Sequence, residues 1–155
     1  MDLIFSAFFV VSILHMGEEY FYPGGFMNVM RSLNPKFAPL VTKTMAIIVN
    51  SLQLVLCIVV ILIGENNLIL SMSLAALLFI NSLVHMGGCI KAKGYAPGVI
   101  TGTLLYLPLS IYAYFHFARS GQLNMSGVII TGMLGLLYQS IPIVYLALAS
   151  AIRRT

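Results

Sequence analysis

The hydrophobic positions of this chain form long runs that are separated by short polar stretches. A helix of about 20 apolar residues is needed to cross a hydrocarbon layer about 30 Å thick. Five runs reach that length, and each predicts one membrane-spanning helix. Their ranges are about 3–22, 40–63, 68–87, 97–118 and 127–152. The pattern therefore predicts an all-α fold, a five-helix transmembrane bundle that forms one integral membrane domain over residues 1–155.

Two shorter segments between these runs have patterns of their own. Within residues 25–33, the apolar side chains of Phe26, Val29 and Met30 share one helical face, which predicts a short helix in the membrane interface. The sequence Gly-Glu-Asn-Asn at 64–67 predicts a tight turn, because glycine and asparagine tolerate turn conformations. Little of the chain is left over, so no separate soluble domain is expected.

Composition supports a membrane protein, and charge predicts its orientation. Hydrophobic residues make up 60% of the chain and charged residues 8%, whereas soluble domains have about 25% charged residues. With five spans, seven of the eight basic residues fall on one side, which the positive-inside rule assigns to the cytoplasm. These seven are Arg31, Lys36, Lys43, Lys91, Lys93, Arg153 and Arg154. The N-terminus is then outside and the C-terminus cytoplasmic, and topology accounts for the basic residues without a nucleic-acid partner.

The chain also contains a weak internal match. "SILHMG" at 12–17 and "SLVHMG" at 82–87 align at an offset of 70 residues, and each is followed by a Tyr-Pro-Gly element. The first and third spans would run in the same direction, as in a parallel duplication of a two-helix unit. Short matches also arise by chance, so duplication and coincidence both stay open.

Several polar residues fall inside the predicted spans, close to one end. At a rise of about 1.5 Å per residue, His15 lies roughly 18 Å and Glu19 roughly 24 Å from the outer face. On the same count Asn81 lies at roughly 20 Å and His85 at roughly 26 Å. Thr101 lies about one turn inside the fourth span. These five residues share the cytoplasmic third of the predicted bundle.

Helical spacing places these side chains on common faces. His15, Glu18 and Glu19 project from one stripe, because residues three and four apart are neighbours on a helix. Asn81 and His85 project from another stripe for the same reason. An ionised side chain at mid-helix costs on the order of 3 kcal/mol. Two adjacent glutamates facing lipid are therefore unfavourable, and they must face each other, a metal ion or water.

Three chemical interpretations of this cluster stay open. In the first, His15, Glu18, Glu19 and His85 bind a divalent metal ion such as zinc, iron or manganese, which offsets the carboxylate repulsion and activates water. In the second, a glutamate acts as a general acid and a histidine as the conjugate base without metal, which suits an isomerase or cyclase. In the third, the same residues relay protons or metal ions in a small transporter.

A fourth interpretation involves no chemistry. A shorter first helix would leave both glutamates at the membrane surface, where they would pair with Arg31 or Lys91. The amides of Asn50, Gln53 and Gln139 also have two explanations, since they can line the same cavity or hydrogen-bond between helices.

Three short motifs resemble those of a known family. "HMGEE" at 15–19, "NSLVH" at 81–85 and "YAPG" at 95–98 occur in that order, and the combination resembles the HXXEE-domain family of small bacterial and archaeal membrane proteins. The resemblance covers most of the first two thirds of the chain and implies a multi-pass protein of a prokaryotic plasma membrane. It implies one shared site without naming a substrate, and the residues of that site are His15, Glu18, Glu19, Asn81, His85, Tyr95 and Pro97.

The combined expectation is a metal-dependent membrane enzyme that acts near the cytoplasmic side on a hydrophobic or amphipathic small-molecule substrate. The expected metal ligands are His15, Glu18, Glu19 and His85, and the expected catalytic or orienting residues are Glu18, Glu19, Asn81, Tyr95 and Thr101. Glycines at 17, 87 and 88 are expected to let helices or a substrate approach closely. The lipid bilayer is the expected surrounding, and a bundle this thin favours a homodimer.

Overall fold

A computed structural model describes residues 3–22 and 25–152 of the chain. The predicted all-α fold class is confirmed, since these residues contain helices and no strand. The last two basic residues used to predict orientation, Arg153 and Arg154, lie outside the described residues.

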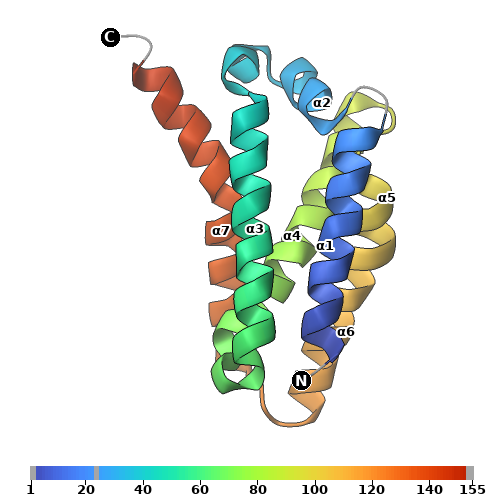
Figure 1. The fold of residues 1–155 in the computed structure, drawn as a ribbon, viewed down its shortest axis with the longest axis vertical. Coiled ribbons are helices and arrows are strands. Elements are labelled where there is room, and N and C mark those ends of the chain that lie inside the picture. The colour runs from blue at the N-terminus through green and yellow to red at the C-terminus, as the bar shows by residue number, and fades with distance from the viewer. Residues whose placement is uncertain (1–2, 23–24, 153–155) are drawn as a thin grey trace.

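The helices follow the predicted runs closely (Figure 1). They are α1 (Leu3–Phe21), α2 (Gly25–Leu33), η1 (Pro35–Leu40), α3 (Lys43–Ile63), η2 (Gly64–Asn67), α4 (Leu68–Ala92), α5 (Val99–Thr101), η3 (Gly102–Tyr106), α6 (Leu107–Arg119) and α7 (Met125–Ile152). The short helix α2 covers the range 25–33 predicted for it. The predicted end of α4 at residue 87 is wrong, because the helix continues through its glycines to Ala92, where the left-handed backbone of Lys93 caps it.

Four helical stretches among the described residues are long and apolar enough to cross a membrane. They are Leu3–Phe21, Lys43–Ala92, Val99–Arg119 and Met125–Ile152. The second is 50 residues long because it joins α3, the 3₁₀ turn η2 and α4. This turn lies at the predicted Gly-Glu-Asn-Asn sequence, and the two helices run antiparallel on either side of it (Figure 1).

The directions of the helices determine which segments lie at each end of the bundle. In Figure 1, α1 begins at the lower end of the molecule and α7 finishes at the upper end. α1 and α4 run in the same direction, and α2 lies across the upper end of the bundle. The upper end therefore collects the last turns of α1 and α4 together with α2 and the loop that leads into α5.

Aromatic packing fills the lower end of the bundle. The rings of Phe5 on α1 and Phe117 on α6 stack with centroids 5.8 Å apart, and Phe8 lies one turn further along α1. These three side chains are almost fully buried, together with Leu74 and Leu78 of α4. Van der Waals packing is the main stabilising contribution between these helices, since lipid around a membrane helix is as apolar as this core. The lower end is thus a packed core, whereas the two histidines meet Glu19 nearer the other end.

α7 packs closely along α4, and a glycine makes this possible. A Cβ atom added at Gly135 of α7 would lie 2.6 Å from the Cβ atom of Ala76 and 2.8 Å from that residue's carbonyl carbon. Such contacts do not occur between real atoms, so the two backbones approach as far as glycine permits. α7 is held against α4 at this point.

We expect Gly135→Ala to destabilise the fold by about 1–3 kcal/mol, because the added methyl group meets backbone atoms that cannot rotate away. Thermal unfolding in detergent measures this effect. Gly132→Ala on the same helix is the matched control, since a Cβ atom there has no neighbour within 4 Å. Equal unfolding temperatures for the two variants would contradict the close approach.

Candidate metal centre

Two buried stripes bring the histidines to the same place. On α1, the spacing of four, four and three residues puts Ile4, Phe8, Ser12 and His15 on one buried face. On α4, the same spacing puts Leu74, Leu78, Ser82 and His85 on one buried face. The residues His15 and His85 are only 2% and 1% exposed. The internal sequence match therefore coincides with two helices that each deliver a histidine to the bundle interior.

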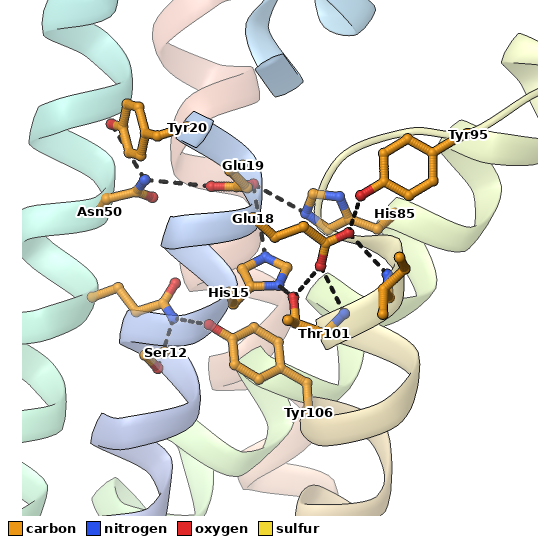
Figure 2. Close-up of polar contacts among 12 residues, drawn as sticks. Ser12, His15, Glu18, Glu19, Tyr20, Asn50, His85, Tyr95, Thr101 and Tyr106 are labelled. Carbon is orange, nitrogen blue, oxygen red and sulfur yellow. Dashed lines mark hydrogen bonds and ion pairs between the residues drawn. The ribbon is translucent and has the colours of Figure 1, made fainter. Parts of the chain in front are cut away.

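The two histidines meet Glu19 (Figure 2). One carboxylate oxygen, Glu19 Oε1, lies 3.2 Å from His85 Nε2 and 3.7 Å from His15 Nε2. The two imidazole rings are perpendicular, with centroids 4.8 Å apart. One ligand atom from each residue lies within 4.8 Å of the others, so these residues form a group that suits a metal ion.

Two of the distances between these atoms are close to those of tetrahedral coordination. Bonds of about 2.1 Å at tetrahedral angles place neighbouring ligand atoms about 3.4 Å apart. The two distances from Glu19 Oε1 to the histidine nitrogens, 3.2 and 3.7 Å, lie on either side of that value. Two imidazoles and one carboxylate are also a ligand set that catalytic zinc sites use with a fourth position open.

Glu18, predicted as a metal ligand, lies outside this group of three. Its Oε1 atom accepts hydrogen bonds from the Tyr95 hydroxyl and from the Ile100 amide at 3.1 Å. Its Oε2 atom accepts from the Thr101 amide at 2.7 Å and the Thr101 hydroxyl at 2.6 Å. Both oxygens are therefore occupied by donors. The two amides belong to the first turn of the helical stretch that starts at Val99, where free amides and the helix dipole favour a carboxylate.

Thr101 connects Glu18 to the histidine. Its hydroxyl has one hydrogen, which it donates to Glu18, so it accepts the hydrogen bond that joins it to His15 Nδ1 at 2.8 Å. The His15 proton is thereby assigned to Nδ1, and Nε2 is left with its lone pair. Carboxylates and hydroxyls that bind the second nitrogen of a metal-ligating histidine orient it in this way.

Two hydrogen-bond acceptors, His15 Nε2 and Glu19 Oε1, consequently face each other in the interior of the bundle. His15 Nε2 carries a lone pair, and the nearest charged atom is the Glu19 carboxylate oxygen 3.7 Å away. Among the described residues His15 Nε2 has no hydrogen-bond partner, and the same holds for His85 Nδ1 and Asn81 Oδ1. Unpartnered buried polar atoms are costly. A cation or a proton between the two acceptors would offset that cost.

Gly98 forms the wall of the site next to both imidazoles. Its φ angle of 95° is one that residues other than glycine rarely adopt. A Cβ atom at Gly98 would overlap the His85 ring and would lie 3.0 Å from His15 Cε1. The prediction that the glycines at 17 and 87 let helices approach closely is wrong, because a Cβ atom at either position would have no neighbour within 4 Å. The alternative, that they let a substrate approach, stays a prediction. Their helices have no tight contact there, and the close approach occurs at the loop instead.

Further residues at the site carried little sequence signal. The ring of Tyr106 packs against His15 with centroids 4.3 Å apart, and Phe26 of α2 packs against His85 at 4.5 Å. Tyr106 lies in the π-helical segment η3, a rare feature that is often found at functional sites. A single tyrosine in an apolar run does not indicate that it contacts a histidine of the site. Phe26 belonged to the predicted apolar face of α2, but that face did not indicate a contact with His85.

A largely apolar cavity of about 330 Å³ opens onto this group. His15, Glu19 and His85 line it, and so does Asn81. Three amides that the sequence left with two explanations also belong to its lining: Asn50, Gln53 and Gln139. Gln53 additionally donates hydrogen bonds to the Tyr106 hydroxyl at 2.8 Å and to Ser12 at 3.1 Å.

The interpretation with a shorter first helix and glutamates paired with Arg31 or Lys91 is wrong on both of these points. α1 continues to Phe21 and includes both glutamates. Among the described residues, the ion pairs of these glutamates join Glu19 to the two histidines, and neither Arg31 nor Lys91 takes part.

Tyr95 lies in the loop between α4 and α5, outside the helices. Burial raises the pKa of its hydroxyl above the ordinary value, and the hydrogen bond to Glu18 and the charge of that carboxylate raise the pKa further. Its ring also packs on Tyr22, with centroids 4.1 Å apart. The predicted site residues Tyr95 and Thr101 therefore contact Glu18, while Asn81 lies on the cavity wall.

A family model described as "Protein of unknown function with HXXEE motif" matches residues 6–113, well over half of the chain. The match includes both helices that provide the histidines and the loop that contains Tyr95 and Gly98. No curated protein and no solved structure matches the chain.

We expect Thr101→Val to release the proton of His15 from Nδ1, because the variant keeps the shape of the side chain and loses its hydroxyl. Nitrogen NMR of the His15 imidazole in chelator-treated protein measures the protonated nitrogen directly. Thr131→Val is the matched control, since Thr131 is fully buried and hydrogen-bonded to Tyr114 away from the site. Each variant loses about 1–3 kcal/mol of stability. A proton that stays on Nδ1 in Thr101→Val would contradict the assigned link.

We expect Glu18→Gln to lower the pKa of Tyr95 toward its ordinary value, because the variant removes the negative charge beside the hydroxyl. The shift is partial, since burial remains the first cause. Titration of labelled tyrosine followed by carbon NMR gives the value. Glu65→Gln, on the η2 turn, is the control, and an unchanged Tyr95 titration in Glu18→Gln would show that the contact is absent.

Proposed function

The chain belongs to the HXXEE family, whose function is unknown, and we propose that it is a membrane-embedded, metal-dependent enzyme. His15, Glu19 and His85 bind one divalent ion, with zinc, iron and manganese as the candidates. The reaction is hydrolysis of a hydrophobic or amphipathic substrate that reaches the site through the cavity beside it. Glu18 is left out of the ligand set because its oxygens already accept four hydrogen bonds.

One observation carries this proposal. His15 Nε2 and Glu19 Oε1 are both acceptors, they face each other across 3.7 Å in a buried place, and His85 completes a three-residue ligand set. Three protein ligands leave one coordination position open, which is typical of catalytic zinc sites and unlike closed structural sites. All three ligands line the same cavity.

When bound, a metal ion of this kind lowers the pKa of a water molecule and polarises the group that the water attacks. The residues of the chain supply orientation. Glu18 and Thr101 fix the His15 ring, as partners of ligating histidines do in other metal sites. Asn81 presents an unpartnered amide oxygen in the cavity wall, which suits a donor group on a substrate. Tyr106 and Phe26 shield the two imidazoles on the remaining sides.

The proposal includes a membrane topology of five crossings. The 50-residue stretch Lys43–Ala92 counts as two crossings, because α3 and α4 are antiparallel around the turn at 64–67. α1 begins and α7 ends at opposite ends of the bundle, which fits an odd number of crossings. With the basic residues of the upper end in the cytoplasm, the N-terminus is outside and the site lies near the cytoplasmic face of a prokaryotic plasma membrane. A homodimer stays a prediction.

A specific contact favours a second function, acid/base catalysis without metal. His85 Nε2 and Glu19 Oε1 are 3.2 Å apart, close enough to share a proton, and such a pair can remove a proton from one carbon and return it at another. Transport is less favoured, because the buried rings of Phe5, Phe8 and Phe117 fill the bundle beyond the site. Metal content separates the first two functions.

We expect purified protein loaded with zinc, iron or manganese to hold one ion per chain by elemental analysis. His15→Ala, His85→Ala and Glu19→Gln lose that ion, because each removes one of only three ligands. His116→Ala and Glu65→Gln are the matched controls, since both residues lie elsewhere, and they retain it. Metal retained in His85→Ala would contradict the site. Wild-type protein that binds none of the three metals would favour the acid/base function.

Activity follows from the same preparations. We expect metal-loaded wild type, incubated with a membrane lipid extract, to convert a component into products that together contain one added water, as seen by mass spectrometry. Thr101→Val, which keeps all three ligands, should retain the metal at about 10–100-fold lower affinity. A product formed equally by metal-free protein would contradict a metal-dependent hydrolase.

A further inference from the structure

A second cavity adjoins the one that contains the histidines. It has a volume of about 450 Å³ and lies between the end of α1, the interfacial helix α2 and the start of α3. Five residues line both cavities: Glu19, Phe26, Met27, Ala46 and Asn50. The proposed metal ligand Glu19 therefore stands at the junction of two spaces that differ in character.

The second cavity is basic and its cations are unpaired. Arg31 of α2 and Lys43 at the start of α3 both line it, together with the hydroxyl-bearing rings of Tyr20 and Tyr22. Within residues 3–22 and 25–152, neither Arg31 nor Lys43 forms an ion pair with a carboxylate. Glu19 also lines this cavity, but its carboxylate pairs with the histidines, so two cations that form no ion pair share one concave surface and favour an anionic ligand.

The chain holds Arg31 in a fixed position. Its Nε and Nη2 atoms donate to the carbonyl oxygen of Val41, at 3.0 and 2.6 Å, and Nη1 donates to Asn28 Oδ1 at 3.4 Å. A guanidinium has five N–H groups, so donors remain after these bonds. A cation held by its own backbone loses little side-chain freedom when it binds an anion, which strengthens binding.

The first cavity is suited to a single apolar chain. Apolar side chains from α3, α4 and α7 line most of it, among them Met45, Leu56, Leu77 and Ile143. Leu52 and Ile143, on α3 and α7, also line it and are 54% and 65% exposed. The cavity thus reaches the outer surface of the bundle, where lipid surrounds a membrane protein. A chain can enter sideways from the bilayer.

We propose that the substrate is an anionic amphiphile with one apolar chain: its negatively charged head lies between Arg31 and Lys43, and its chain lies in the cavity that His15 and His85 close. The proposal rests on the proposed function and adds the charge and shape of the substrate to it. The bond to be cleaved then lies where head and chain join, beside Glu19. Since a bound cation offsets the charge of Glu19, the metal-loaded protein binds the anionic head more tightly than the metal-free protein.

The test uses three probes with the full chain in phosphatidylcholine nanodiscs. Dodecyl phosphate carries both head and chain, inorganic phosphate carries the head alone, and 1-dodecanol carries the chain alone. Equilibrium binding with labelled probes should give much the highest affinity for dodecyl phosphate. Replacing part of the phosphatidylcholine by phosphatidylglycerol, an anionic lipid with two chains, should not displace it.

Variants test the two ends of the ligand separately. Arg31→Gln and Lys43→Glu should each weaken binding of dodecyl phosphate about tenfold, because each removes an interaction with the anionic head. The Lys43 side chain forms no hydrogen bond or ion pair within the described residues, so Lys43→Glu tests the charge even if Arg31→Gln disturbs α2. Lys91→Glu is the matched control, an exposed lysine outside both cavities, and leaves binding unchanged. Ala46→Phe narrows the junction and should abolish dodecyl phosphate binding.

Metal content is measured on every variant, so that a failure of this inference can be told from a failure of the proposed function. We expect the Arg31, Lys43 and Ala46 variants to retain the ion. If 1-dodecanol bound as tightly as dodecyl phosphate, the requirement for a negatively charged head would be wrong. If inorganic phosphate bound as tightly, the requirement for an apolar chain would be wrong. Displacement by phosphatidylglycerol would overturn the single-chain substrate and assign the site to a bilayer lipid. Normal metal content with unchanged binding in Lys43→Glu would overturn the inference and leave the metal site standing.

Discussion

The contact on which the site depends is the one between the Glu18 carboxylate and the first turn of the helical stretch 99–119. Two backbone amides at the start of a helix need acceptors, and a glutamate at the end of α1 supplies both. The same carboxylate fixes Thr101, and Thr101 fixes His15. One residue of the paired glutamates therefore joins two helices, which leaves the other, Glu19, to face the histidines. Glu18 thus binds the start of the next helical stretch, whereas Glu19 contacts the two histidines.

Much of this arrangement was predictable, because it follows from local periodicity. Apolar runs gave the helices, and three- and four-residue spacing placed His15, Glu19 and His85 on inward faces at matching depths. The family predicted from three motifs is confirmed. Depth along parallel helices is a reliable guide, since every helix rises by the same amount per residue.

The remaining features depend on contacts between distant segments, which periodicity does not describe. Glu18 and Glu19 share a face by spacing, yet the loop before α5 captures only the first of them. The predicted end of α4 was five residues too early, at 87 instead of 92, because glycines inside a membrane helix do not stop it. The π-helical turn that brings Tyr106 against His15 has no sequence pattern of its own. The basic cavity requires α2 to fold back across the ends of α1 and α3 (Figure 1).

The backbone at Gly98 has a consequence for related sequences. A methyl group there would occupy the space of the His85 ring, so the smallest possible replacement already excludes the imidazole from its place. A sequence that carries the histidine and glutamate motifs but another residue at this position must arrange its second histidine differently. The residue at this position thus indicates which related sequences can place the two histidines as this chain does.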